Sequence, residues 1–292
     1  MNKYYKILNN YSGWFYILPS MLVLLCVVIY PVIYSIAISF YNRPFTHKDS
    51  AFVGLDNFIF MINEPLFQKA FINTTIYTSS SLFITFVLGF TLALLMTKIS
   101  YGNRLFQILL ILPMAMAPLV VGLTWRWMYN PLFGLINWFF KLVNIEPQAW
   151  LASQETAMIA LIWVDVWQWT SLVFLIIYAG LSGLPKEPFE AANLDGANSF
   201  TIFIRITIPL LKPVILVVLL LRTVDSFRTF DSAYVLTDGG PGDATELLSL
   251  YIYRHGFFFN NQGEAAAGAL IMLLFISLIS IIYFKYLYKI KN

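Results

Sequence analysis

Four charged residues recur at a spacing of three within one long apolar segment of this sequence. They are Arg222, Asp225, Arg228 and Asp231, all within residues 208–236. Charges inside a membrane are costly, and they tend to face the protein interior or a watery cavity. Neighbours in the series can pair on a helix, but the series winds around it, because each step falls about 60° short of a full turn. Some of the four must therefore lock the segment to neighbouring helices, while others can line a path for a polar solute.

A second group of polar and aromatic residues surrounds Asp165. Its members are Trp163, Trp167, Gln168 and Trp169. Sugar rings pack their CH groups on aromatic faces, while Asp and Gln side chains bond the hydroxyls. Such aromatic residues can equally pack against lipid or other helices. Asp165, Gln168 and Trp169 are therefore candidates for the solute path, and Asp165 is also a candidate ion-pair partner for Arg222 or Arg228.

The composition is that of an integral membrane protein. The chain has 292 residues, 59% of them hydrophobic and only 11% charged, whereas soluble domains carry about 25% charged residues. With a net charge of +3 and no continuous basic tract, nucleic-acid binding is not expected. The single cysteine, Cys26, excludes a disulfide within the chain. His47 and His255 lie in predicted loops without metal-ligand spacing, so we expect no metal site and do not favour a membrane-embedded enzyme.

Six segments are long and apolar enough to span a membrane, which takes about 20 residues. They cover roughly residues 14–40, 71–97, 105–128, 156–181, 208–236 and 265–288. We therefore expect an all-α integral membrane protein with six transmembrane helices in a single transmembrane domain, residues 1–292. A secondary transporter that works alone would show similar halves, and the sequence shows none.

The distribution of Lys and Arg predicts the orientation. One side would carry Lys3, Lys6, Lys98, Arg104, Lys186, Arg205, Lys212, Lys285, Lys289 and Lys291. The other side would carry only Arg43, Lys48, Lys69, Arg126, Lys141 and Arg254. Both termini and the 182–207 loop should therefore be cytoplasmic, with the loops 41–70, 129–155 and 237–264 outside.

The 182–207 loop carries helix start and stop signals. Pro and acidic residues suit the first turn of a helix, and Gly readily takes the left-handed conformation at a helix end. We expect a short helix from about Pro188 to Asp195, a turn at Gly196, and a second short helix over 200–205 capped by Asn198 or Ser199. By itself this pattern fits an interfacial linker and a partner-docking surface equally well.

One motif in this loop resembles the EAA loop of ABC importer permeases. Glu190-Ala191-Ala192 is followed at the family's spacing by Gly196 and then by Ile206-x-Ile208-Pro209, where the family has Leu in place of Ile208. Further segments resemble the carbohydrate branch of this family, namely Asn103-Arg104, Leu112-Pro113, 122–127, 163–170, Phe230-Asp231 and 237–241. The likeness covers most of residues 71–288, the expected permease core. It implies a type I ABC importer permease fold with residues 182–207 as the cytoplasmic coupling loop.

The resemblance also implies roles for residues of this loop. In the family the EAA loop is a coupling helix that docks on a cytoplasmic ATPase. Carried over, Glu190 would pair with a basic residue of the ATPase, Ala191 and Ala192 would permit close contact, Asp195 would end the helix and Gly196 would make the turn. This chain would be a transport subunit rather than an enzyme and would bind no cofactor. ATP and Mg would be used by two partner ATPase subunits.

Further partners follow from the same resemblance. A second homologous permease subunit would complete the channel in a prokaryotic cell (inner) membrane. An extracytoplasmic solute-binding protein would dock on the outer loops, including Gly239, Gly240 and Pro241. The expected solute is a sugar or oligosaccharide, and glycerol phosphate or another non-sugar solute is the alternative. A second Glu-Ala-Ala, within 263–268, lacks the following spacing, and we interpret it as a helix start with small residues for close packing.

Overall fold

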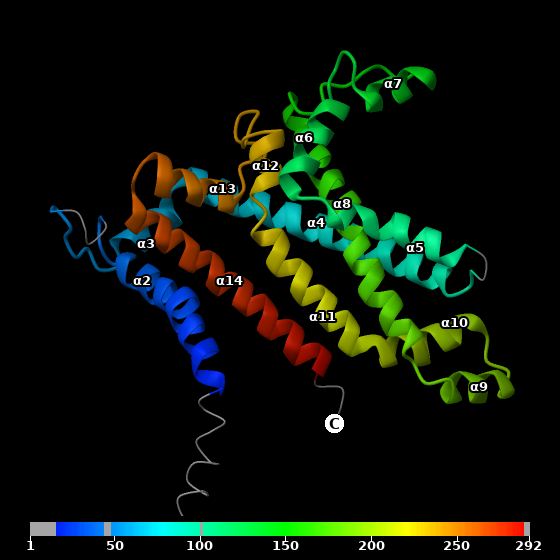
Figure 1. The fold of residues 1–292 in the computed structure, drawn as a ribbon. Helices are drawn as coiled ribbons and strands as arrows, with labels where there is room; N and C mark the ends of the chain where they lie inside the picture. Colours follow the sequence, from blue (N-terminus) through cyan, green and yellow to red (C-terminus); the bar gives the residue numbers. More distant parts are fainter. Residues whose placement is uncertain (1–15, 44–47, 100–101, 289–292) are drawn as a thin grey trace, which may run out of the picture. The chain divides into compact units, whose positions relative to one another are not determined.

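The computed structural model describes residues 16–43, 48–99 and 102–288 of the chain. Lys3, Lys6, Lys289 and Lys291, which entered the predicted orientation, lie outside these residues. In the described parts, every regular element is a helix, and the chain also forms one isolated bridge, between Tyr41 and Phe52 (Figure 1). Within these described ranges, five helices are long and apolar enough to cross a membrane, or six if one bent pair is a single span. The prediction of an all-helical membrane protein is therefore confirmed.

The chain divides into two compact units. The first comprises residues up to Asn63 together with Ile252–Ile271. It contains the span Tyr16–Ile38, which includes η1 (Leu25–Ile29) and α2 (Tyr30–Ile38), as well as α3 (Asp56–Asn63) and η4 (Arg254–Phe258). Asn57 Nδ2 donates to the carbonyls of Ser39 and Tyr41 at 2.8 Å, which ties α3 to the end of α2. The predicted helix start at 263–268 is confirmed, since α14 (Gln262–Tyr288) begins there with Ala265 and Ala267 buried.

The second unit comprises Glu64–Tyr251 and the residues from Met272 onward. Its long helices are α4 (Pro65–Met96), α8 (Gln154–Ser182), α11 (Ile208–Phe227) and the second half of α14. Helices α4 and α8 approach closely at Gly89, where an added Cβ would lie only 2.7 Å from Cβ of Val173. Small residues at such crossings let helix backbones come together in a membrane, where the hydrophobic effect does not drive helices to associate.

The third predicted span is not one straight helix. It consists of α5 (Asn103–Ile111) with η2 (Leu112–Ala115), followed by α6 (Pro118–Met128), and the two parts are bent by 98°. Met116 and Ala117 between them are extended, with ψ near 139° and 135°. A residue before proline is disfavoured in the helical conformation, and Pro118 has no backbone N–H to continue the ladder. The third predicted span, over 105–128, is therefore present as a bent pair of helices that is broken just before Pro118.

The fifth span begins and ends earlier than predicted. One apolar helical run extends over Ser199–Phe227, through α10 (Ser199–Ile202), η3 (Phe203–Thr207) and α11. The second short helix predicted in the loop is thus continuous with this span. Its start is capped as expected, because Asn198 Oδ1 accepts from the Thr201 amide at 2.8 Å. The π-helical turn η3 lies just before Pro209, where the ring would otherwise clash with the carbonyl four residues earlier.

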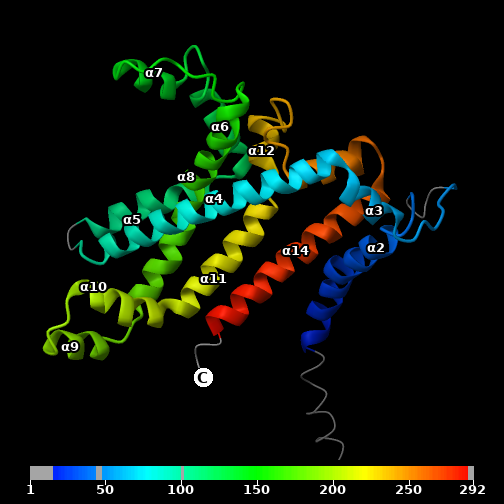
Figure 2. The same cartoon turned by 180° about the vertical axis from the view of Figure 1, so that it is seen from behind.

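The end of the fifth span corrects the prediction for its charges. Helix α11 ends at Phe227, and Asp231 begins a separate helix, α12 (Asp231–Leu236). The second unit also contains α7 (Leu135–Leu142) and α9 (Glu187–Leu194), and α13 (Leu248–Tyr253) begins in it and ends in the first unit. Seen from both sides, α7 and α9 lie at opposite ends of this unit (Figures 1 and 2). The 129–155 and 182–207 loops therefore lie on opposite sides, as the alternation of spans requires.

Candidate functional site

The Glu-Ala-Ala motif lies on α9, a short helix between the fourth and fifth spans. Glu190 and Ala191 are exposed and Ala192 is half-buried. The helix ends at Leu194, with Asp195 as its exposed C-terminal cap. Gly196 takes φ +72°. Its amide donates to Asn193 O at 3.1 Å, and the next amide, of Ala197, donates to Ala192 O at 2.9 Å. This pair of bonds is the Schellman arrangement, so Gly196 makes the predicted left-handed turn.

The tip of α9 also presents an apolar side chain that sequence reasoning missed. Leu194 is 90% exposed, at the end of the helix beside Asp195. Only its position next to the motif could have singled it out. This short helix thus presents small, acidic and apolar side chains together, and its C-terminal end is held by the two bonds at Gly196 and Ala197.

Two of the predicted path residues form a buried ion pair. Arg222 Nη2 on α11 lies 2.5 Å from Asp165 Oδ2 on α8, and both side chains are almost completely buried. Ser81 of α4 donates to the same carboxylate and lies 3.3 Å from Arg222 Nη2. The Arg222 guanidinium also lies over the ring of Trp169, 5.4 Å from its centroid. Asp165 thus pairs with Arg222, one of its two candidate partners, and the contact joins three helices.

Gln168 makes a hydrogen bond to the backbone at the break in the third span. Its side chain is 2% exposed, and Nε2 donates to the carbonyl of Met116 at 2.9 Å. That carbonyl lies in the extended break between η2 and α6, where no helical amide is placed to bond it. Gln168 and Trp169 therefore face structural partners, rather than lying beside Trp163 and Trp167 in one site.

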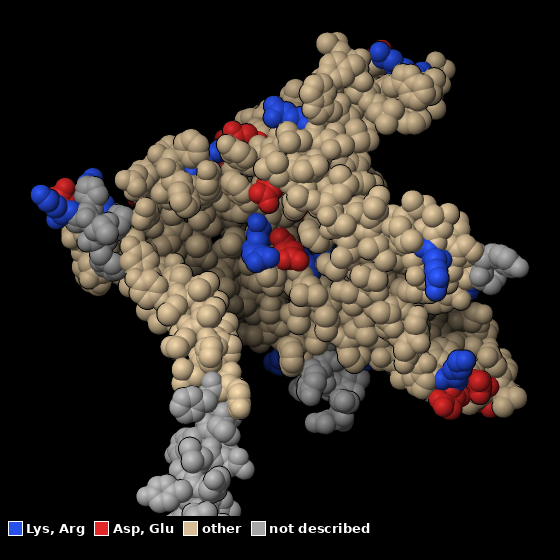
Figure 3. Space-filling view, viewed as in Figure 1, with Lys and Arg blue, Asp and Glu red and all other residues tan. Residues whose placement is uncertain are grey.

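The other three charges are accessible. Arg228 Nη2 pairs with Asp225 Oδ1 at 2.7 Å, and their side chains are 64% and 31% exposed. Asp231 is also exposed. Acidic and basic side chains gather over the junction of α11 and α12, near the centre of the face shown in Figure 3, and further charged groups lie toward its edges. The four charges of the sequence thus divide into one buried residue, Arg222, and three residues whose side chains are at least partly exposed.

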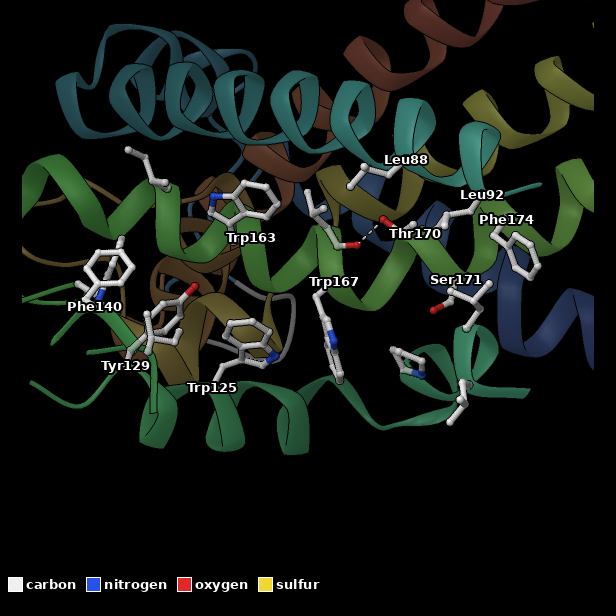
Figure 4. Close-up of a pocket in the computed structure, with 17 residues that line it drawn as sticks. Leu88, Leu92, Trp125, Tyr129, Phe140, Trp163, Trp167, Thr170, Ser171 and Phe174 are labelled. Carbon is white, nitrogen blue, oxygen red and sulfur yellow. Dashed lines mark hydrogen bonds between the residues drawn. The ribbon is translucent and has the colours of Figure 1, made fainter. Parts of the chain in front are cut away.

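Aromatic residues of α6 and α8 line a pocket of about 620 Å³. Trp163 and Trp167 of α8 face Trp125 and Tyr129 across it, and the rings of Trp125 and Trp167 meet edge to face at 5.7 Å (Figure 4). Burial raises the pKa of Tyr129, which follows the end of α6, and the protonated hydroxyl donates to Ala160 O at 3.1 Å. Thr170 Oγ1 donates to Val166 O. Because these hydroxyls are already bonded, the pocket offers aromatic faces with few polar partners for a sugar.

The turn-rich loop after α12 is fastened to the start of α4. Lys69 Nζ donates to Gly242 O, and Asn73 Nδ2 donates to Asp243 O, each at 2.9 Å. Of the three residues expected to meet a binding protein, Gly239 is buried, while Gly240 and Pro241 are half-buried. Among the described residues, no group of three or more His, Cys, Asp and Glu side chains could hold a metal ion.

A helical membrane bundle with a capped, exposed Glu-Ala-Ala helix between two of its spans defines the permease class of ABC importer subunits. The family described as "Binding-protein-dependent transport system inner membrane component" matches residues 85–289, and the chain belongs to this family. It is thus a multi-pass transport subunit, and in such importers the ATPase is a separate subunit. The expected family and fold are confirmed.

Relatives cover nearly the whole chain. The trehalose/maltose transport system permease protein MalF of Thermococcus litoralis is 35% identical over 94% of this chain and 92% of its own length. The arabinooligosaccharides transport system permease protein AraP of Bacillus subtilis is 32% identical over 91% of this chain and 85% of its own length. A crystal structure of a bacterial ABC transporter that imports alginate superposes with a TM-score of 0.84 over 99% of this chain and all of the matched chain, at 20% identity.

Proposed function

We propose that this permease imports a sugar or oligosaccharide. The support is its identity of 35% and 32% to permeases named for trehalose/maltose and for arabinooligosaccharides. The accessible Asp225–Arg228 pair and Asp231 offer acceptors and donors of the kind that bond hydroxyl groups. An unpaired basic cluster, which would favour glycerol phosphate, is not found at this site, because Asp225 accompanies Arg228.

The predicted solute-path residues divide into two roles in this proposal. Asp225, Arg228 and Asp231 contact the solute, since all three are accessible. Asp165, Gln168, Trp169 and Arg222 hold helices in place, since each makes a contact to another helix or to the break in the third span. Breaking a buried pair is strongly destabilising, so the second group supports transport through the fold.

The proposed coupling runs through α9. Glu190 pairs with a basic residue of the ATPase, Ala191 and Ala192 allow close approach, and Asp195 and Gly196 fix the end of the helix. Two ATPase subunits use ATP and Mg, and a second homologous permease completes the channel. Closure of the ATPase pair moves α9, and the cavity alternates between the two sides of the membrane, as in other rigid-body switches.

The remaining predictions of topology and docking also stand as proposals. Both termini lie in the cytoplasm of a prokaryotic cell, and residues 1–292 work as one transmembrane domain with 71–288 as the permease core. The fastened loop at Gly239, Gly240 and Pro241 meets an extracytoplasmic solute-binding protein. Its two bonds to α4 give it the rigidity of a docking surface.

The proposal is tested by ATP-dependent uptake in liposomes that contain this chain and its partner subunits. Labelled mono- and oligosaccharides should be taken up and should compete with one another, while glycerol phosphate should not compete. Uptake of glycerol phosphate alone would select the alternative solute, and uptake without any ATPase would refute the importer role. Glu190→Lys should abolish uptake, whereas the matched variant Glu187→Lys, exposed one turn earlier on the same helix, should retain it.

A further inference from the structure

Helix α7 buries its uncharged polar residue and exposes apolar ones, the reverse of a helix in an aqueous loop. Its one uncharged polar residue, Asn137, is 2% exposed. Asn137 Nδ2 donates to Gln148 O at 2.9 Å, while Oδ1 accepts from the Gln148 amide at 3.1 Å and from Trp150 Nε1 at 3.0 Å. The amide therefore holds the returning chain against the inner side of the helix, so that the other side faces outward.

The outward side of α7 is apolar. Leu135, Trp138, Phe139 and Leu142 follow the spacing i, i+3, i+4, i+7, so they form one stripe, here called the outer stripe. Their exposed fractions are 47%, 53%, 54% and 60%. A contiguous apolar stripe of this kind is costly in water, because burial of apolar surface is the main favourable term in folding and association. Something apolar must cover it.

The outer stripe is continuous with the exposed face of a spanning helix. On α6, Leu119, Leu123 and Trp127 lie four residues apart and are 49%, 44% and 66% exposed. The centroid of the Trp127 ring then lies 5.6 Å from that of Phe133, which is 62% exposed and is separated from α7 only by Gly134. The apolar surface of the span thus continues around the end of α6 and onto the outer stripe.

The composition of α7 favours lipid, rather than water or a protein partner, as the surroundings of the outer stripe. Its sequence combines Trp138 and Phe139 with Lys141 in its last turn. Tryptophan is enriched where the bilayer meets water, and lysine extends its charge toward the headgroups while its stem stays in apolar surroundings. Helices of this kind lie in the plane of the interface with the apolar face about 5–10 Å deep in the headgroup and acyl boundary.

We propose that α7 is an interfacial anchor, with its outer stripe buried in the leaflet on the side of the membrane opposite α9. The anchor fixes the C-terminal end of α6 at a set depth, and the bend of 98° in the third span lies at the other end of this helix. It also covers one side of the aromatic pocket, since Ile136 and Phe140 on the inner side of α7 line that pocket. This role is independent of which solute the permease carries.

The experiment uses nitroxide labels on the complete transporter in lipid nanodiscs. The only cysteine of the chain, Cys26, is replaced by serine, and single cysteines are introduced by Phe139→Cys or Leu142→Cys, with cysteine-free partner subunits. Glu146→Cys, at an exposed position after the helix, is the matched control. Collision rates with oxygen, which partitions into lipid, are compared with those of a water-soluble nickel chelate.

At both stripe positions, oxygen should collide severalfold more often than the chelate, and at Glu146 the order should reverse. Preferential collision with the chelate at both stripe positions would place α7 in water and overturn the proposal. Low rates for both reagents at both positions would show that another protein subunit covers the stripe, which would also overturn it.

Discussion

Arg222 Nη2 lies 2.5 Å from Asp165 Oδ2, and neither side chain is more than 3% exposed. Two further nitrogens of this guanidinium, Nε and Nη1, make no hydrogen bond to the described residues, although both are buried. The hydroxyl of Ser81 and the ring of Trp169 also contact the pair. Removing one partner would leave the other charge buried without compensation, which costs far more than removing both.

We therefore expect Asp165→Leu or Arg222→Met alone to destabilise the subunit by about 3–5 kcal/mol. The double variant should recover most of that loss, because neither charge then remains buried. Unfolding of the purified protein, followed by circular dichroism, measures the difference. Asp225→Leu is the control, since its pair with Arg228 is exposed and should contribute only about 0–1 kcal/mol. Strictly additive losses in the double variant would show that the two residues act separately.

Substitutions of Gln168 and of Asp225 should have opposite effects on stability and on the apparent KM for the solute: the first should change stability, the second the KM. Gln168→Leu should lower stability by roughly 1–3 kcal/mol, because Met116 O loses its donor, while the apparent KM for the solute stays near that of the parent. Asp225→Asn should raise the apparent KM and leave stability almost unchanged. Concentration-dependent uptake and thermal unfolding provide both readings. A raised apparent KM for Gln168→Leu would instead indicate that Gln168 contacts the solute.

Gly196 should tolerate asparagine better than alanine. At φ +72°, an alanine costs roughly 1–2 kcal/mol, whereas asparagine adopts this conformation more readily. No atom lies within 4 Å of an added Cβ, so crowding plays no part. ATP-dependent uptake should fall most for Gly196→Ala and less for Gly196→Asn. Gly183→Ala, at φ −92° with its nearest contact at 3.6 Å, should have little effect; equal uptake by all three variants would rule out a need for this turn.

The contact between α4 and α8 should be sensitive to one methyl group. Gly89→Ala would place Cβ 2.7 Å from Val173 Cβ and should destabilise the subunit by about 1–3 kcal/mol. Val173→Ala in the same chain should relieve part of this loss by removing the opposing methyl groups. Unfolding midpoints of the single and double variants test the prediction, which would be contradicted if Val173→Ala made Gly89→Ala worse.

Features that depend on neighbouring residues were predictable from the sequence. Apolar runs of about 20 residues located the spans, and the chemistry of Pro188, Asp195 and Gly196 predicted α9 and its left-handed end. These signals are local, because helix caps and membrane spans are specified by residues next to one another in the chain. The family motif at Glu190 is also read from contiguous residues.

The division of the charges was decided by tertiary structure. Asp165 and Arg222 are separated by 57 residues in the chain, and their pairing depends on how α8 and α11 are rotated against α4. The end of α11 at Phe227 removed Asp231 from the span, although mostly apolar residues follow it over 233–236. The inward Asn137 of α7 likewise depends on the return of the chain at Gln148. Helix rotation and chain return arise from packing between distant segments, which periodicity along one segment does not specify.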